Sequence, residues 1–181
     1  MEFKKIQLNG FKSFAEKTNF LIEDGLTGIV GPNGCGKSNI VESLRWVMGE
    51  TSAKSMRGSG MEDVIFSGTS NKASKNIAEV SIEVENKDKE GTIQYRETEQ
   101  IQVRRKIEKD KGSKFYINDK EVRARDAQMF FADLSTGAHS PSMISQGRIG
   151  ALVTAKPTDR RAILEELQEY LVCTLEDMRL N

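Results

Sequence analysis

Apolar and polar residues alternate in several stretches of the chain, and this period of two predicts β-strands. The alternation covers residues 6–8 near the N-terminus and residues 80–84 in the middle of the chain. Two further apolar runs, 101–103 and 115–117, flank the polar turn 109–113, which is the pattern of a β-hairpin. The pattern therefore predicts a sheet with an antiparallel portion.

In three other regions apolar residues recur every three or four positions, which predicts amphipathic helices. The first apolar face consists of Ile40, Val41, Leu44, Val47 and Met48. The second consists of Ala127, Phe130, Phe131 and Leu134. The third consists of Ile163, Leu164, Leu167, Tyr170, Leu171, Leu175 and Met178. The third face is long for one lobe, so we expect this helix to pack against a partner helix.

Residues 26–30 form an apolar, β-branched run, which predicts a buried strand leading into a glycine-rich loop. The loop fits the phosphate-binding pattern G-x-x-x-x-G-K-[ST] and reads Gly31, Pro32, Asn33, Gly34, Cys35, Gly36, Lys37, Ser38. Gly34 and Gly36 allow backbone angles that bring N–H groups around a polyphosphate. Lys37 would reach the β- and γ-phosphates, and the Ser38 hydroxyl would bind Mg²⁺. Since a strand, the loop and a helix occur in the expected order, we predict binding of ATP with Mg²⁺.

Composition and charge exclude several classes of protein. Lys plus Arg and Asp plus Glu both number 27, so a nucleic-acid or membrane partner would need a local patch of charge. No apolar segment follows the first residues, so we expect no secretory signal, and no run is long enough to span a membrane. The two cysteines, Cys35 and Cys173, predict no disulfide framework, which favours a cytoplasmic location.

Two positively charged regions each allow two interpretations. Arg57 lies in the glycine-rich stretch 49–60, where it either swings onto a phosphate of ATP or DNA or is solvated. Residues 104–125 carry nine Lys or Arg against four Asp or Glu. This hairpin is either a nucleic-acid patch or, as is more common, a solvated face.

Residues 129–133 also allow two interpretations. They imitate the apolar strand that ends in a Mg²⁺-binding aspartate in many P-loop enzymes, with Asp133 in that position. That interpretation makes the chain a self-contained P-loop phosphotransferase. The helical period of the same residues, and their lack of β-branching, favour a helix instead.

These residues together resemble the N-terminal head segment of the structural maintenance of chromosomes (SMC) family, in its bacterial form. The matching segments occur in the family's order over nearly the whole chain: 10–14, 31–38, 45–50, 56–58, 61–66, 144–149 and 155–166.

The resemblance implies roles for individual residues. Lys37 and Ser38 keep the phosphate and Mg²⁺ roles given above. Gln146 is similar to the family's Q-loop glutamine, which contacts Mg²⁺ and the attacking water. Arg57 resembles the arginine linked to DNA-stimulated hydrolysis. The segment similar to the one that flanks the nucleotide base is Lys12, Ser13 and Phe14.

The fold implied is α/β: the N-terminal lobe of a P-loop ABC-type ATPase head, with a mixed sheet that includes an antiparallel portion. It ends in a helix that starts a coiled coil. Residues 1–166 would form the lobe, and residues 167–181 a divergent helical tail. The function implied is ATP binding in a chromosome condensation and partitioning ATPase of the cytoplasm, associated with the nucleoid.

The family's signature loop, Walker B aspartate and catalytic glutamate have no credible counterpart in this sequence, so hydrolysis would need a C-terminal head lobe. The other partners implied are a second head in a homodimer, DNA and a kleisin-type accessory subunit, with no membrane. Besides the phosphotransferase, one more alternative is a non-enzymatic head fragment that binds partner heads or DNA.

Overall fold

The computed structural model describes residues 2–87 and 95–133, together with Lys156 and Arg161. The chain divides into two units, Met1–Ala138 and His139–Asn181. The elements described below all lie in the first unit. In the second unit, the exposed residues Lys156 and Arg161 are the described ones.

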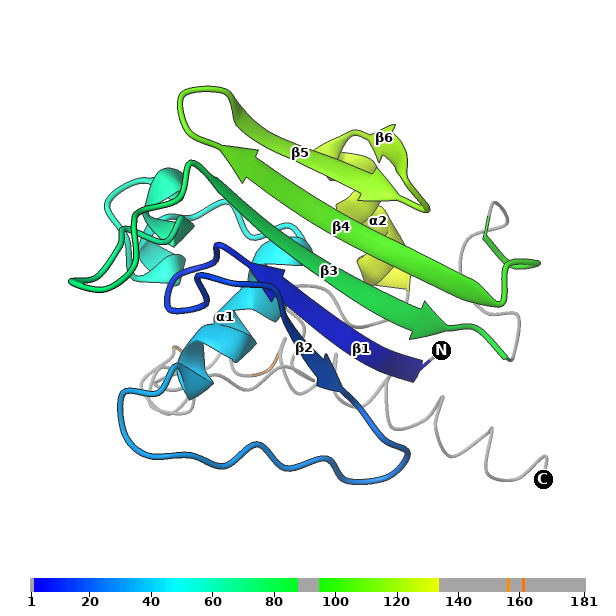
Figure 1. Ribbon diagram of the computed structural model, residues 1–181. Helices are drawn as coiled ribbons and strands as arrows, with labels where there is room; N and C mark the ends of the chain where they lie inside the picture. Colours follow the sequence, from blue (N-terminus) through cyan, green and yellow to red (C-terminus); the bar gives the residue numbers. More distant parts are fainter. Residues whose placement is uncertain (1, 88–94, 134–155, 157–160, 162–181) are drawn as a thin grey trace. The chain divides into compact units, whose positions relative to one another are not determined.

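The first unit contains six strands and two α-helices in the described residues (Figure 1). The strands are β1 (Glu2–Asn9), β2 (Thr18–Leu21), β3 (Ile77–Glu85), β4 (Gln100–Glu108), β5 (Gly112–Ile117) and β6 (Lys120–Val122). The helices are α1 (Lys37–Val47) and α2 (Ala124–Asp133). Two short 3-10 helices, η1 (Lys54–Met56) and η2 (Met61–Val64), lie between α1 and β3.

The strands form one sheet in the order β2-β1-β3-β4-β5-β6, and each neighbouring pair is antiparallel. The register aligns one apolar residue from each of four strands in a row, because Ile6 faces Ile82, Ile82 faces Val103 and Val103 faces Ile117. All four are buried. The period of two therefore places alternate residues on one covered face, which confirms the predicted strands and hairpin.

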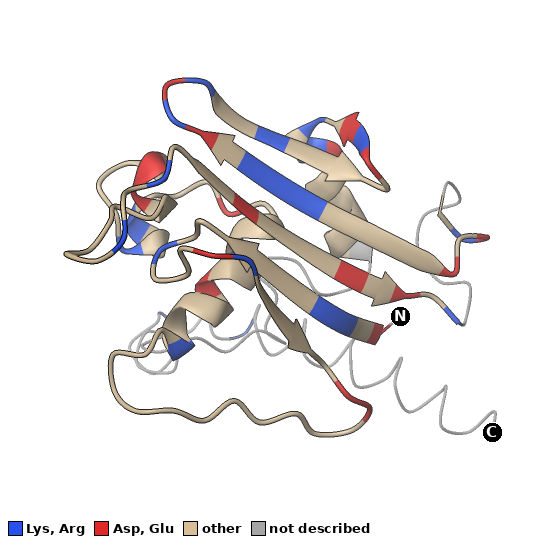
Figure 2. Ribbon diagram, viewed as in Figure 1, with Lys and Arg blue, Asp and Glu red and all other residues tan. Residues whose placement is uncertain are grey.

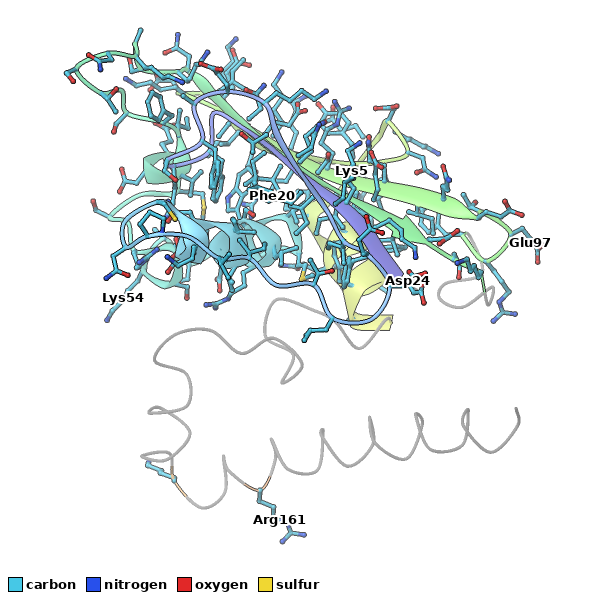
Figure 3. All side chains as sticks on the ribbon, turned by 60° about the horizontal axis from the view of Figure 1, so that its bottom comes forward. Lys5, Phe20, Asp24, Lys54, Glu97 and Arg161 are labelled. Carbon is cyan, nitrogen blue, oxygen red and sulfur yellow. The ribbon has the colours of Figure 1, made fainter. Side chains whose placement is uncertain are left out.

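Both helices cover that face of the sheet, as Figure 3 shows from the side. Trp46 of α1 is fully buried and packs against Phe11 with ring centroids 5.5 Å apart. Phe130 and Phe131 of α2 are buried against each other at 5.3 Å. Large aromatic side chains remove much apolar area from water, so burying these rings beneath the sheet stabilises both helices there.

The predicted first helix is confirmed, but its buried face differs from the predicted one. The buried residues of α1 are Ile40, Glu42, Ser43, Trp46 and Val47. Val41 and Leu44, which the apolar pattern placed in the core, are half-buried. The face is turned because Trp46 is the largest apolar group on the helix and because Lys12 and Arg57 neutralise Glu42 on that side.

The predicted strand at 26–30 is wrong: these residues have no regular secondary structure. Leu26 is 99% exposed and Val30 is 94% exposed. A strand is stable only when a neighbouring strand satisfies its N–H and C=O groups, and no described residue pairs with this run. The α/β lobe with an antiparallel sheet is confirmed, whereas no parallel pairing occurs among the described strands.

The segment 129–133 is helical, as its period predicted, and Asp133 is the last residue of α2. It therefore does not follow a strand, as the phosphotransferase interpretation required. Among the helices that the structure describes, none has the length and apolar character to cross a membrane.

Candidate nucleotide-binding site

The glycine-rich loop runs directly into α1, and Gly36 is the N-cap residue of that helix. Gly34 has φ 81° and Gly36 has φ 98°, which are left-handed values that glycine adopts without strain. The first N–H groups of a helix have no partner within it, and the helix dipole places positive charge at the same end. The loop and helix together therefore have the features of an anion site.

Lys37 is the first residue of α1, and its side chain turns back over the loop. Its Nζ donates hydrogen bonds to the carbonyl oxygens of Gly31 at 2.5 Å and Pro32 at 2.7 Å. The Sγ of Cys35 lies 3.8 Å from the same nitrogen. The ammonium group is thus held among loop atoms by neutral acceptors, and no carboxylate of the described residues pairs with it, so an anionic group can compete for it.

The segment Lys12–Phe14 packs against this loop from another part of the chain. A Cβ on Gly36 would lie 2.5 Å from the Oγ of Ser13 and 3.4 Å from the ring of Phe14. The Phe14 ring meets Phe20 of β2 edge-on, with centroids 5.8 Å apart. Glycine is therefore required at position 36 for close approach as well as for its φ angle. Of the predicted site residues, this brings together Ser13, Phe14 and the loop.

Arg57 lies near the first turns of α1, where a cluster of polar groups meets. Its Nη2 donates to the Oδ1 of Asn39 at 3.1 Å, and it forms an ion pair with Glu42. Lys12 forms an ion pair with the same carboxylate. The Nδ2 of Asn39 in turn donates to the Oγ of Ser13 at 2.9 Å. Asn39 and Glu42, which sequence reasoning missed, thus connect the predicted residues.

The C-terminal end of α1 is fixed by its own chain turn, by β4 and by α2. Gly49, at φ 105°, closes the helix while the N–H of Glu50 donates to the carbonyl of Arg45. Arg105 of β4 donates from Nη1 to the carbonyls of Trp46 and Glu50, each at 2.7 Å.

Two further contacts complete this end. The Nε2 of Gln128 in α2 donates to the carbonyl of Gly49 at 2.8 Å. The Arg105 guanidinium lies over the rings of Trp46, at 4.5 Å, and Phe115, at 4.6 Å. Burial lowers the pKa of Arg105 to about 10, and the charge of Glu50 opposes this shift, so the group stays protonated at neutral pH.

The predicted Mg²⁺ site lies only partly within the described residues. Gln146 lies outside the described residues, so its position relative to Ser38 is not given. In the described part of the chain, no group of three or more His, Cys, Asp or Glu residues could hold a metal ion. Of the two predicted Mg²⁺ ligands, Ser38 and Gln146, the structure therefore describes Ser38, which is exposed near the start of α1.

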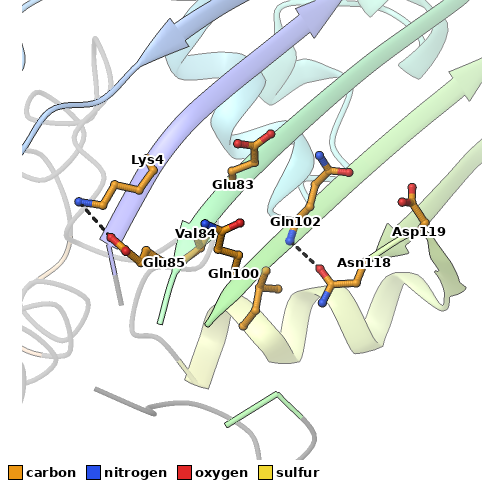
Figure 4. A pocket seen from close by; sticks show the side chains of 9 residues that line it. Lys4, Glu83, Val84, Glu85, Gln100, Gln102, Asn118 and Asp119 are labelled. Carbon is orange, nitrogen blue, oxygen red and sulfur yellow. Dashed lines mark hydrogen bonds and ion pairs between the residues drawn. The ribbon is translucent and has the colours of Figure 1, made fainter. Parts of the chain in front are cut away.

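A polar pocket of about 580 Å³ lies elsewhere, at the ends of β3 and β4 (Figure 4). Its charged lining is mainly acidic, with Glu83, Glu85 and Asp119 against Lys4. Lys4 pairs with Glu85 at 3.3 Å. This lining is unsuited to phosphate and includes no residue of the glycine-rich loop.

The positively charged hairpin is partly neutralised. Figure 2 shows a band of Lys and Arg across β4, but Arg105 in that band points into the core. Arg104 pairs with Asp119 at 2.9 Å, Lys111 with Glu108 at 2.5 Å and Lys114 with Glu121 at 3.1 Å. This mixture of charges favours the solvated-face interpretation.

Comparison with known proteins agrees with this geometry. Residues 2–148 match the family described as the RecF/RecN/SMC N terminal domain. The chain belongs to this family. The chromosome partition protein Smc of Cereibacter sphaeroides is 53% identical over 166 residues, which cover 92% of this chain and 14% of that protein. The Smc protein of Mycobacterium tuberculosis is 42% identical over the same shares of the two chains. This member of the SMC family therefore spans about 14% of the length of those relatives.

Solved SMC heads have the same fold. One, from a study of ATP-driven dimerization and DNA-stimulated activation of SMC ATPases, has a TM-score of 0.82 and 30% identity. It covers 92% of this chain and 99% of that one. Another, an Smc head bound to the C-winged helix domain of ScpA, has a TM-score of 0.85 and 30% identity. It covers 92% of this chain and 50% of that one. The predicted resemblance and fold class are confirmed.

Proposed function

We propose that this chain is the ATP-binding lobe of an SMC-type ATPase that organises chromosomal DNA. The observation that carries the proposal is the continuous unit of glycine loop and helix, with Gly36 in close contact with Ser13 and Phe14. Lys37 and the loop N–H groups would bind the phosphates. Phe14 and its neighbours would border the base. Bound Mg²⁺ would neutralise phosphate charge, and Ser38 and Gln146 are the residues proposed to hold it.

The exposed run at 26–30 supports the participation of a second lobe. Leu26, Ile29 and Val30 expose large apolar surface directly before the phosphate loop. A neighbouring strand would satisfy their backbone groups and cover these side chains. We assign this covering role to a C-terminal head lobe, which would also supply the missing signature loop and catalytic carboxylates.

The similar heads support further partners for the assembled protein. One comes from a study of ATP-driven dimerization and DNA-stimulated activation, and another is bound to a ScpA domain. By analogy, a second head, DNA and a kleisin-type subunit are the partners that we propose for this protein. Residues 1–166 would form the lobe and residues 167–181 the start of a helical tail.

The test is an ATP-binding and turnover assay of the chain with and without the C-terminal head lobe of the Cereibacter sphaeroides relative. Calorimetry should show that the chain alone binds Mg-ATP. The chain alone should not turn over ATP, because several catalytic groups are missing together, and adding the lobe should start turnover. Gln146→Ala should then abolish most of it.

Two outcomes would favour the alternatives. Steady hydrolysis by the chain alone, lost in Asp133→Asn, would indicate a self-contained P-loop enzyme. Mg-ATP binding with no turnover in the presence of the lobe would indicate a non-enzymatic head fragment.

A further inference from the structure

One buried carboxylate on α1, Glu42, holds two cations that come from different segments of the chain. The residue is 8% exposed. Its Oε2 pairs with the Nζ of Lys12, which follows β1, and its Oε1 pairs with the Nη2 of Arg57, which follows η1. One cation is enough to neutralise the carboxylate, so this cluster carries a surplus positive charge.

The two cations differ in how firmly they are held. The Lys12 side chain is 13% exposed, and its ammonium also donates to the carbonyl of Met56. The Arg57 side chain is 57% exposed, and its other polar contact within the described part of the chain is the neutral Oδ1 of Asn39. An ion pair with an exposed member is weak and screened by salt, whereas a buried one is costly to break. Lys12 is therefore the permanent partner of Glu42, and Arg57 is the releasable one.

This difference allows Arg57 to leave without leaving a buried charge uncompensated. Glu42 would keep its pair with Lys12, so the usual cost of an unpaired buried carboxylate would not arise. Arg57 also follows η1 directly, and its long side chain can leave Glu42 by rotating about its own χ angles, while Asp63 holds the backbone at Ser59 and Gly60.

Arg57 is also held close to the phosphate loop. Asn39, its second partner, donates to the Oγ of Ser13. The same Oγ lies 2.5 Å from the position that a Cβ on Gly36 would take. The guanidinium is therefore linked through two hydrogen bonds to a side chain that touches the last glycine of the loop.

We propose that Glu42 is a positioning residue that retains Arg57 beside the loop and releases it to the phosphates of a bound nucleotide. Lys12 is the permanent counter-ion that makes this release possible. A polyphosphate carries more negative charge than one carboxylate and accepts both arms of a guanidinium, so it competes well with Glu42. The release step rests on the proposed nucleotide-binding function, but the retention of Arg57 by Glu42 does not.

Retention is tested without nucleotide by the rate at which phenylglyoxal modifies Arg57, followed by mass spectrometry. Arg125, an exposed residue of α2, is the internal reference. Glu42→Gln keeps the size of the side chain and removes its charge, so Arg57 should react about threefold faster relative to Arg125. An unchanged ratio in a folded Glu42→Gln variant would overturn the proposal.

Asn39→Asp provides a second test of the retention of Arg57, which can be used if Glu42→Gln does not fold. This variant adds a carboxylate beside Arg57 and leaves the pair between Glu42 and Lys12 intact. Arg57 should then react about threefold more slowly than in the wild type, again relative to Arg125. Equal rates in the variant and the wild type would contradict retention by charge.

Release is tested by Mg-ATP affinity in a double-mutant cycle of Asn39→Asp and Arg57→Ala. Stronger retention of Arg57 should weaken Mg-ATP binding about threefold, and this loss should shrink in the Arg57→Ala background. An equal loss in both backgrounds would mean that the new carboxylate repels phosphate directly, and would overturn release. If the wild type itself binds no Mg-ATP, the proposed function fails, while the modification rates still decide whether Glu42 retains Arg57.

Discussion

The two ends of α1 differ sharply in how they are held. At the C-terminal end, Arg105 of β4 and Gln128 of α2 donate hydrogen bonds to backbone carbonyls of the helix end, and residues 46–50 are buried. At the N-terminal end, Lys37 is bound by its own loop, and residues 31–35 are exposed. One end is therefore fixed by this chain alone. The other is open to a ligand and lies next to an apolar run that the described residues leave uncovered.

This difference matters for a phosphate site because a ligand binds well only when its partners are held in place beforehand. The fixed C-terminal end supplies that support, since it sets the axis of α1 against the sheet. The open end then needs only small adjustments of Lys37 and Arg57. We expect substitutions at the fixed end to change stability and substitutions at the open end to change binding.

The largest effect is expected for Arg105→Met. Methionine cannot donate to the carbonyls of Trp46 and Glu50, so two buried acceptors lose a charged partner, and the contacts with two rings are lost as well. The free energy of unfolding should fall by about 3–5 kcal/mol, as measured by urea unfolding.

Arg104→Met is the matched control for this change. Arg104 is the neighbouring residue on the outer face of β4, where it pairs with Asp119 at 2.9 Å. Its loss should cost only about 1 kcal/mol, because Asp119 is 81% exposed and the contacts of Arg104 with Glu79 and the Tyr116 ring also lie on the outer face. Equal losses for the two variants would contradict the special role of Arg105.

At the open end, Lys37→Ala should weaken Mg-ATP binding by about 2–3 kcal/mol, because charge-assisted hydrogen bonds to phosphate are strong. Calorimetry measures this loss. The urea unfolding curve should hardly move, since the contacts of Lys37 with described residues are all to atoms of its own loop. Lys120→Ala, on the distant hairpin, should leave affinity unchanged. Full affinity in Lys37→Ala would show that the loop does not bind phosphate.

Secondary structure could be predicted from the sequence where it depends on a local pattern. The prediction was wrong where the structure depends on groups that are distant in the chain. The strands around 80–84 and 101–103 follow from their period of two, and α1 and α2 follow from theirs. The run at 26–30 has the composition of a strand, but composition cannot provide the neighbouring strand that it needs. The phosphate loop, by contrast, was predictable, because its backbone conformation depends on its own glycines.

The missed residues follow the same rule. Glu42 was missed because its two cations, Lys12 and Arg57, lie far from it in sequence. Arg105 did leave a signal: it occupies an inward position of β4, in phase with Ile101, Val103 and Ile107. A cation in the apolar phase of a strand predicts a buried acceptor, although not which one.

A smaller effect on stability is expected at Gly49, where the helix ends. Gly49 has φ 105°, and a Cβ there would lie 2.3 Å from the Cγ of Gln128. Gly49→Ala should therefore cost about 2–3 kcal/mol in the free energy of unfolding, from torsional strain plus the clash. Gln128→Ala removes the side chain that causes the clash. Gly49→Ala should therefore cost less in the Gln128→Ala background than in the wild type.

Gly112→Ala provides the control for the torsional part. Gly112 has φ 80°, and a Cβ there would meet no atom within 4 Å. Its substitution should cost about 1–2 kcal/mol, which is the strain of a left-handed residue without a clash. If Gly49→Ala costs no more than Gly112→Ala, close packing against α2 does not hold this end of the helix.

The smallest effect is expected at Asp63, which fixes the loop that follows Arg57. Its Oδ2 accepts hydrogen bonds from the N–H groups of Ser59, at 2.6 Å, and Gly60, at 2.9 Å. These backbone bonds, that of Gly60 first, hold the pKa of Asp63 below its usual value of 3.8. The folded state thus binds this proton more weakly than the unfolded state. The resulting stabilisation is complete above the unfolded pKa and is lost as the pH falls through the lower, folded pKa.

Asp63→Asn should therefore lower stability at pH 7 and make little difference at the acid end of the range. Urea unfolding at pH 7, 5 and 3 measures the change, and the gap between variant and wild type should narrow toward pH 3. Ser59→Ala, which removes only the Oγ bond at 3.0 Å, should give a smaller gap with the same trend. A gap that stays constant with pH would mean that Asp63 acts through its shape and not through its charge.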